Sequence, residues 1–248
     1  DVVTSPSNEK IFLKNRPGLV PYSTHTAGEG RGIFIWANYG HEIHVIGNKV
    51  YWDGSVVITL STSTGQVGFA EHVDGSAQHT VLMVDGVSGY VFETDGTFLP
   101  CVPTTWLAST AYALGAAVSP SPANEYCYDC TVAGTTSGTQ PTWPTTVGST
   151  VTDGTVTWTC REQAFPTPHQ PYPIFLDGYL FLAKTDTQDI QNCDLNYPLK
   201  WSAGNYCTAE MYQDTVVALA KNNNMIYGIG QNSVQFFYDN ANPTGTPL

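Results

Sequence analysis

A recurring dipeptide holds many of the acidic residues in this 248-residue sequence. Asp-Gly occurs at 53–54, 74–75, 85–86, 95–96, 153–154 and 177–178. A carboxylate beside a glycine accepts the hydrogen bonds of a tight turn, and the glycine can take a positive φ. No pair of carboxylates stands apart from these turns, so we expect no catalytic acid and base, and no enzyme activity.

Other catalytic patterns are weak. The stretch 86–89 lacks the spacing of a Gly-x-Ser-x-Gly nucleophile elbow. The glycine-rich stretches 28–32 and 228–232 each lead into a predicted strand, whereas a phosphate loop needs a helix N-terminus. Residues 151–158 partly match the Ser-x-Asp-x-Gly-x-x-Trp turn of propeller glycosidases, once and with the aspartate one place late. A propeller glycoside hydrolase is therefore the weakest alternative.

Histidine and cysteine spacing predicts no metal site and no cofactor. His41 and His44 lie three apart on a predicted strand, so they point to opposite faces. Cys127 and Cys130 have the gap of a zinc knuckle, but no second pair follows at a suitable distance. For the cysteines, a Cys130–Cys160 disulfide and free buried thiols both remain open.

Composition favours short strands and an acidic surface. With 23 Gly, 16 Pro and 12% charged residues, the chain lacks the content of long amphipathic helices. The net charge of −12 repels phosphate backbones, which suits either simple solubility or a passage that DNA crosses without sticking. No apolar run approaches the ~20 residues of a membrane-spanning helix, so no membrane insertion is expected.

Short apolar runs alternate with turn residues from Gly32 onward, which predicts a meander of antiparallel strands. Gly47-Asn48 suits a two-residue hairpin turn. The predicted strands are 33–37, 42–46, 49–52, 56–60, 67–70, 80–84, 90–94, 174–176, 179–183, 215–220, 225–229 and 233–238.

The same strand–turn–strand unit recurs at Ile33–Ile46, Val81–Thr94, Ile174–Lys184 and Val216–Ile229. Removing residues 103–164 leaves spacings of roughly 30–50 residues, the range of propeller blades. We therefore expect an all-β fold based on a β-propeller, with its completeness in this chain left open. A β-sandwich is the alternative, because it also consists of serial short strands.

The removed segment differs in composition. Residues 103–164 are rich in Thr, Ser, Gly and Pro, and proline-dense joints flank them at Pro100–Pro103 and Pro166–Pro173. We expect an inserted small β-sandwich-like module at 103–164, which divides the propeller into two segments. The first propeller segment, with an N-terminal extended stretch, is 1–102, and the second is 165–248.

Aromatic residues are the remaining functional feature of the module. Trp106 and Trp158 are expected in its core, given their strand context. Trp143 lies in a proline-flanked loop and is the best candidate for an exposed face. Exposed aromatic rings can stack on sugars, so the candidate glycan contacts are Trp143, Tyr126 and Tyr128.

Two stretches resemble the tail hub, or packaged-DNA stabilisation, proteins of short-tailed bacteriophages. The first is Lys14-Asn-Arg-Pro-Gly18, leading into the predicted hairpins of 32–52. The second runs from Asp189 to Phe237 and includes Asn196-Tyr-Pro-Leu-Lys-Trp201, Ala209-Glu210 and Asp214. Residues 106–160 resemble a carbohydrate-binding-like module of phage tail proteins, through Gly-Thr-Thr-Ser-Gly138, Pro-Thr-Trp-Pro144 and Val-Thr-Asp-Gly-Thr-Val-Thr-Trp158.

The resemblance implies a structural virion protein of a phage tail hub or nozzle. Its propeller would assemble as a ring of six copies below the portal, close the tail channel, retain packaged DNA and pass it on ejection. Its implied partners are the portal or adaptor, a tail fibre or spike, and DNA bound without sequence specificity. The alternative is a phage or surface adhesin that binds host glycans through 103–164. Family members are usually longer than this chain.

Overall fold

The computed structural model describes residues 2–4, 11–13, 25, 27–242 and 245–248. The regular elements in these ranges are β-strands, which confirms the expected all-β class. None of the described residues belongs to a helix long and apolar enough to cross a membrane. Near the N-terminus, β1 (Val2–Thr4) pairs antiparallel with β2 (Ile11–Leu13).

Four antiparallel sheets follow one another along the chain, and in each sheet neighbouring strands are consecutive in sequence. The first contains β3 (Gly30–Trp36), β4 (His41–Ile46), β5 (Lys49–Trp52) and β6 (Ser55–Thr59). The second contains β7 (Gly68–Val73), β8 (His79–Val84), β9 (Gly89–Glu93) and β10 (Phe98–Pro100). The third contains β18 (Ile174–Leu176), β19 (Tyr179–Ala183), β20 (Asp189–Asp194) and β21 (Tyr197–Thr208). The fourth contains β22 (Val216–Asn222), β23 (Met225–Gly230) and β24 (Val234–Tyr238).

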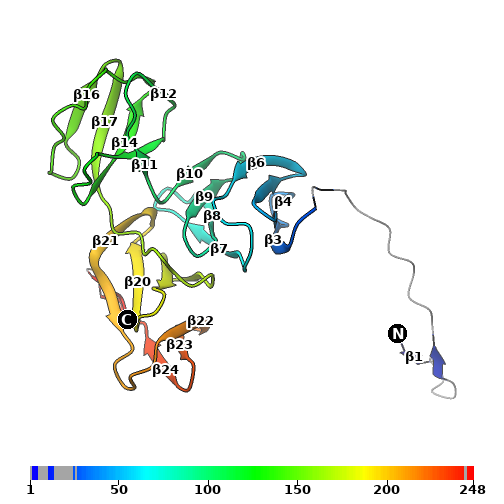
Figure 1. Ribbon diagram of the computed structural model, residues 1–248. Helices are drawn as coiled ribbons and strands as arrows, with labels where there is room; N and C mark the ends of the chain where they lie inside the picture. Colours follow the sequence, from blue (N-terminus) through cyan, green and yellow to red (C-terminus); the bar gives the residue numbers. More distant parts are fainter. Residues whose placement is uncertain (1, 5–10, 14–24, 26, 243–244) are drawn as a thin grey trace.

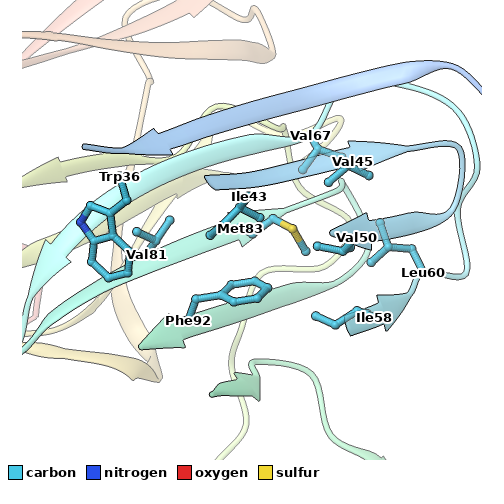
Figure 2. Close-up of a cluster of buried hydrophobic side chains, with 10 residues drawn as sticks. All are labelled: Trp36, Ile43, Val45, Val50, Ile58, Leu60, Val67, Val81, Met83 and Phe92. Carbon is cyan, nitrogen blue, oxygen red and sulfur yellow. The ribbon is translucent and has the colours of Figure 1, made fainter. Parts of the chain in front are cut away.

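These sheets stack face to face in chain order, along an arc in Figure 1. Side chains of a strand alternate between its two faces. In β8, Val81 and Met83 pack into the core shared with the first sheet, which Figure 2 shows. Leu82 and Val84, between and after them, pack into the core shared with the third sheet. The second sheet is therefore covered on both faces.

The third sheet repeats this arrangement. In β19, Leu180 and Leu182 contact the core shared with the second sheet, whereas Phe181 and Ala183 contact the core shared with the fourth. A continuous run of buried residues is the pattern of a strand enclosed on both sides. Two facing sheets of a sandwich would leave alternate residues in solvent, so the stack differs from the β-sandwich alternative. The described strands show no closure of the stack into a ring.

Specific polar contacts hold the second and third sheets together. The His72 side chain in β7 is fully buried, and its Nε2 lies 3.2 Å from the carbonyl oxygen of Gly178 in the β18–β19 turn. His169, also buried, lies 2.7 Å from the carbonyl oxygen of Pro166 through Nδ1 and accepts from the Gly86 backbone N–H through Nε2. These contacts fit neutral imidazoles, each with one donor and one acceptor nitrogen.

In the sequence, the inserted segment lies between the second and third sheets of the stack, and it forms its own sheets and its own core. A five-stranded sheet has the order β11-β13-β14-β17-β16, and β12 pairs with β15. The β11–β13 pair is parallel. Figure 1 shows these strands grouped apart from the stack. Their bounds are β11 (Thr104–Thr105), β12 (Ala111–Tyr112), β13 (Ala117–Ser119), β14 (Tyr126–Val132), β15 (Gly134–Thr135), β16 (Thr150–Asp153) and β17 (Val156–Glu162).

One of the four predicted repeats, the second, does not begin where the corresponding sheet begins. The expected second copy, Val81–Thr94, contains β8 and β9, the middle of the second sheet, which begins earlier at Gly68. The four sheets begin at residues 30, 68, 174 and 216, which gives spacings of 38, 106 and 42. Subtracting the roughly 62 residues of 103–164 reduces 106 to about 44, within the range of propeller blades.

Candidate functional site

A buried carboxylate organises the core of the module. Asp153 ends β16, and its Oδ2 accepts hydrogen bonds from the indole N–H groups of Trp106 at 2.8 Å and Trp158 at 3.2 Å. Its Oδ1 accepts from the Ser137 backbone N–H at 2.9 Å and the Ser137 hydroxyl at 2.6 Å. Burial on its own raises the pKa of Asp153, but these donors outweigh it and lower that pKa.

This carboxylate therefore does more than close a turn, although it belongs to an Asp-Gly dipeptide. By contrast, Asp74, Asp85 and Asp95 accept backbone N–H groups within their own turns, as the sequence predicts. Trp106 and Trp158 are 9% and 0% exposed, which confirms their expected place in the core. The sequence contained one indication of this site, because Asp153 and Trp158 both belong to the 151–158 motif.

The predicted glycan contacts divide into buried and partly exposed residues. Tyr128 is 0% exposed, and its hydroxyl donates to the Pro144 carbonyl oxygen at 2.8 Å, so its prediction as a contact is wrong. Trp143 is half-buried: its ring centroid lies 4.2 Å from that of Tyr128, and its indole N–H donates to Gln140. The expectation of a freely exposed Trp143 ring is therefore corrected, because the ring closes the edge of the core. Tyr126 is half-exposed and faces a cleft.

The Cys130–Cys160 disulfide is absent, and both thiols are free and buried. Cys130 lies opposite Trp158, and Cys160 lies opposite Tyr128, so the two cysteines are diagonal neighbours on β14 and β17. Cα atoms in diagonal positions are about 7–8 Å apart, at or beyond the reach of a disulfide, about 7 Å. Burial raises the pKa of both thiols, which keeps them protonated and unreactive.

The described residues contain no group of three or more His, Cys, Asp or Glu side chains that could hold a metal ion. The zinc-knuckle spacing at 127–130 places its two thiols apart. Cys127 donates to the Glu162 carbonyl oxygen, whereas Cys130 donates to that of Val132. On β4, His41 lies opposite Trp36 and His44 lies opposite Ile33, so the two imidazoles lie on opposite faces, as predicted.

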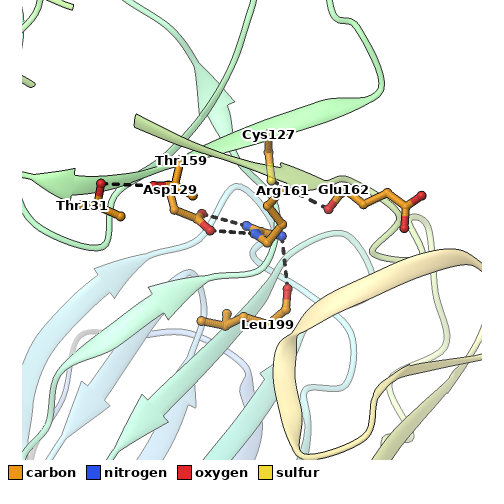
Figure 3. A network of polar contacts seen from close by, with 7 residues as sticks. All are labelled: Cys127, Asp129, Thr131, Thr159, Arg161, Glu162 and Leu199. Carbon is orange, nitrogen blue, oxygen red and sulfur yellow. Dashed lines mark hydrogen bonds and ion pairs between the residues drawn. The ribbon is translucent and has the colours of Figure 1, made fainter. Parts of the chain in front are cut away.

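A buried arginine joins the module to the third sheet (Figure 3). Arg161 in β17 forms two hydrogen-bonded contacts with the Asp129 carboxylate of β14, at 2.9 and 3.1 Å. Its Nη1 also donates to the Leu199 carbonyl oxygen in β21 at 3.1 Å. A planar guanidinium that bonds two elements at once fixes their relative orientation.

A polar cleft of about 410 Å³ lies beside this joint, between the module and the third sheet. Tyr126 lines the cleft, and its side chain also packs against the core of the module. The rest of the lining contains carboxylate, amide and ammonium groups. The Gln163 Oε1 atom is buried without a hydrogen-bond partner. An aromatic ring among hydrogen-bonding side chains can bind a polyhydroxylated ligand. The polar lining residues besides Tyr126 are Glu125, Glu162, Gln163, Thr167, Lys184 and Gln191.

Sequence reasoning reached Tyr126 but missed the other residues of the cleft. Lys184 and Gln191 lie more than fifty residues away from Tyr126, and the folded joint brings them together. No family model matches the sequence, and no curated protein matches it.

Proposed function

We propose that this chain is a structural component of a bacteriophage tail hub or nozzle, built on a β-propeller whose blades are the four stacked sheets. The chain-ordered stack carries the proposal, because its second and third sheets are packed on both faces. Consecutive sheets that each contact the preceding and following sheet are the construction of a propeller. The module at 103–164 then projects from the junction between two blades as a small β-sandwich-like accessory.

The second stretch that resembles the tail hub family, Asp189–Phe237, forms much of the third and fourth sheets. Trp201 is 1% exposed between the second and third sheets, and its indole N–H donates to the Pro198 carbonyl oxygen at 2.9 Å. The Asp214 carboxylate accepts the backbone N–H groups of Gln231 and Asn232 in the Gly-turn of β23–β24. These contacts support the proposal, because they stabilise the two sheets that would serve as blades. The Lys14–Gly18 stretch lies outside the described residues.

As a hub component, the protein assembles with further copies into a ring of six that closes the tail channel and retains packaged DNA. The net charge of −12 favours a channel along which DNA slides without binding during ejection. Its partners are the portal or adaptor above and a fibre or spike below.

Native mass spectrometry and electron microscopy of the purified chain test this proposal. We expect rings of about six copies with the modules on the outside. A protein that stays monomeric at all concentrations, or assembles into open filaments, would contradict it.

A glycan-binding adhesin is the second candidate, and the cleft at Tyr126 favours it. The test is a glycan array probed with the full chain, in which saturable binding is expected to disappear in Tyr126→Ala. Tyr197→Ala is the matched control, because Tyr197 is 53% exposed on β21 and does not line the cleft. Binding that survives Tyr126→Ala, or is absent in the wild type, removes this candidate.

A further inference from the structure

A short segment ahead of β3 lies across the β4–β5 hairpin. The Glu29 carbonyl oxygen accepts a hydrogen bond from the Gly47 backbone N–H at 2.8 Å. A Cβ atom on Gly28 would lie 2.9 Å from the Gly47 backbone nitrogen, so the two backbones are nearly in contact. His25 extends this contact onto the face of the first sheet that points away from the second sheet. We call His25 and residues 27–29 the strap.

Two stacked rings of the first sheet lie against His25. His44 of β4 and Tyr51 of β5 are opposite each other in the strand register, and their ring centroids are 4.8 Å apart. The neighbours of His44, Ile43 and Val45, pack into the core with the second sheet, so the His44 ring points the other way. The His25 ring centroid lies 4.5 Å from that of each ring. His44 and Tyr51 are only 7% and 4% exposed, which the second sheet cannot explain.

The bonding of the His44 ring fits its neutral form. Glu42 Oε1 lies 3.4 Å from Nδ1, whereas Nε2 is buried without a hydrogen-bond partner. A neutral imidazole with its proton on Nδ1 leaves a lone pair on Nε2, but a protonated ring carries a second N–H there. That donor would be buried and unpaired, which is unfavourable. Burial and the charge of the neighbouring His25 lower the pKa of His44, and Glu42 offsets only part of this effect.

The charges around this cluster also favour the neutral state. Glu42 is the carboxylate that pairs with His44, and it can compensate one positive charge on the two imidazoles but not two. Protonating both rings at a centroid distance of 4.5 Å would bring two like charges close together. A hollow of about 480 Å³ borders both rings, so His25 can turn away from His44. The other charged side chains on the elements around the cluster are Arg31 of β3, Lys49 of β5 and Glu29 of the strap.

We infer that the strap is a pH-dependent closure of the first sheet: it lies on His44 and Tyr51 at neutral pH and opens when acid protonates His25 and His44. Opening separates the two positive rings and lets water reach His44 Nε2. The open form takes up protons more readily than the closed form, so its population rises as pH falls. Opening also exposes the rings of His44 and Tyr51, which gives the sheet an aromatic surface in acid. The device lies within one copy, so it does not depend on the hub or the adhesin proposal.

Amide hydrogen exchange of the full chain, followed by NMR, tests the strap at one bond. The Gly47 N–H is released when the strap opens, because it donates to Glu29. With its ordinary pKa of 6.5 in the open form and a neutral ring in the closed form, His44 raises the opening constant by about 30-fold between pH 7.5 and pH 5. After correction for the intrinsic exchange rate, Gly47 protection should fall by about 10- to 30-fold. The protection of the Leu60 N–H, which donates to Asn48 outside the strap, should change much less.

Two variants remove the titrating rings one at a time. His44→Phe keeps a ring on Tyr51 but takes up no proton, so its Gly47 protection should fall by less than about threefold over the same range. His25→Phe keeps the contact without its charge and should give a smaller fall than the wild type, and it serves as the test where circular dichroism shows that His44→Phe is unfolded. His41→Phe is the matched control, because His41 lies on the opposite face of β4, and it should respond like the wild type. Constant protection in the wild type, or a full response in His44→Phe or His25→Phe, would overturn the inference.

Discussion

The guanidinium of Arg161 donates a hydrogen bond to the Leu199 carbonyl oxygen over 3.1 Å, which links the module to the third sheet of the stack. Leu199 packs beside the core between the second and third sheets, so the bond ends on a rigid part of the stack. The same side chain bonds Asp129 inside the module. The module is therefore held in a defined orientation, and the cleft beside Tyr126 keeps its shape.

Arg161→Met should destabilise the joint. It removes the donor from the Leu199 carbonyl and leaves the Asp129 carboxylate without its cation. Breaking a fully buried pair costs about 3–5 kcal/mol, and we expect about 2 kcal/mol because water screens the partly exposed Asp129. Urea unfolding and amide hydrogen exchange in β17 and β21 measure this. Lys200→Met, at an exposed residue nearby, is the control, and equal effects of the two substitutions would contradict the assignment.

Asp153→Asn should unfold the module before the stack. The amide nitrogen of Asn cannot accept from an N–H or O–H donor, so either the two indoles or the Ser137 groups lose their acceptor. Leaving buried donors unpaired costs about 2–3 kcal/mol. Thermal unfolding followed by tryptophan fluorescence should show an earlier transition. Asp95→Asn, in an exposed Asp-Gly turn, should leave the curve unchanged.

Acid should weaken the same site. The folded pKa of Asp153 is below its ordinary value of 3.8. A depressed carboxyl pKa gives stability that is complete above the unfolded value and is lost as pH falls through the folded one. The fluorescence transition of the wild type should therefore move to lower temperature below about pH 4. Asp153→Asn should lack this part of the pH dependence, and an identical acid response in both proteins would contradict the prediction.

Mild acid should loosen the contact between the second and third sheets. Burial lowers the pKa of both His72 and His169 from 6.5. The unfolded chain therefore binds protons first, so their stabilisation is complete above about pH 6.5 and declines as pH falls toward the folded values. His169→Gln keeps an acceptor for the Gly86 N–H but takes up no proton. The free energy of unfolding should fall less between pH 8 and 5.5 in this variant, and an unchanged slope would contradict the account.

Gly68→Ala should disrupt the return of the chain from the module into the stack. A Cβ on Gly68 would overlap the Pro171 carbonyl oxygen, and that backbone atom cannot move aside as a flexible side chain can. Overpacking a rigid site costs about 3 kcal/mol. Gly30→Ala is the control, because nothing lies within 4 Å of its added Cβ. Comparable denaturant midpoints for the two variants would show that the close contact between Gly68 and Pro171 does not contribute to stability.

The sequence predicted the strands whose apolar residues are packed on both faces. Strands such as Tyr179–Ala183 can be recognised in the sequence as continuous apolar runs, because every residue is buried. It missed β10, β20 and β21 as strands. β20 carries Asn192, a fully buried amide that bonds backbone carbonyls, and β21 is an edge strand with Pro198 and register shifts. Proline is tolerated in β21 because an edge strand leaves one side of its ladder unpaired.

The candidate sites were less predictable because they depend on contacts between distant segments. The prolines near Trp143 predict an exposed loop residue, but its ring packs against Tyr128, which lies on a strand fifteen residues earlier. The joint of Arg161 with Leu199 spans 38 residues, and no local pattern indicates it. The local sequence did predict the Asp-Gly turns, because neighbouring residues alone determine the conformation of such a turn.

A cryo-electron microscopy reconstruction of the assembled protein tests the central claim most directly. We predict sheets of three or four strands arranged radially around a common axis, with the modules on the periphery. Copies joined through their modules, with sheets that do not surround a common axis, would contradict it.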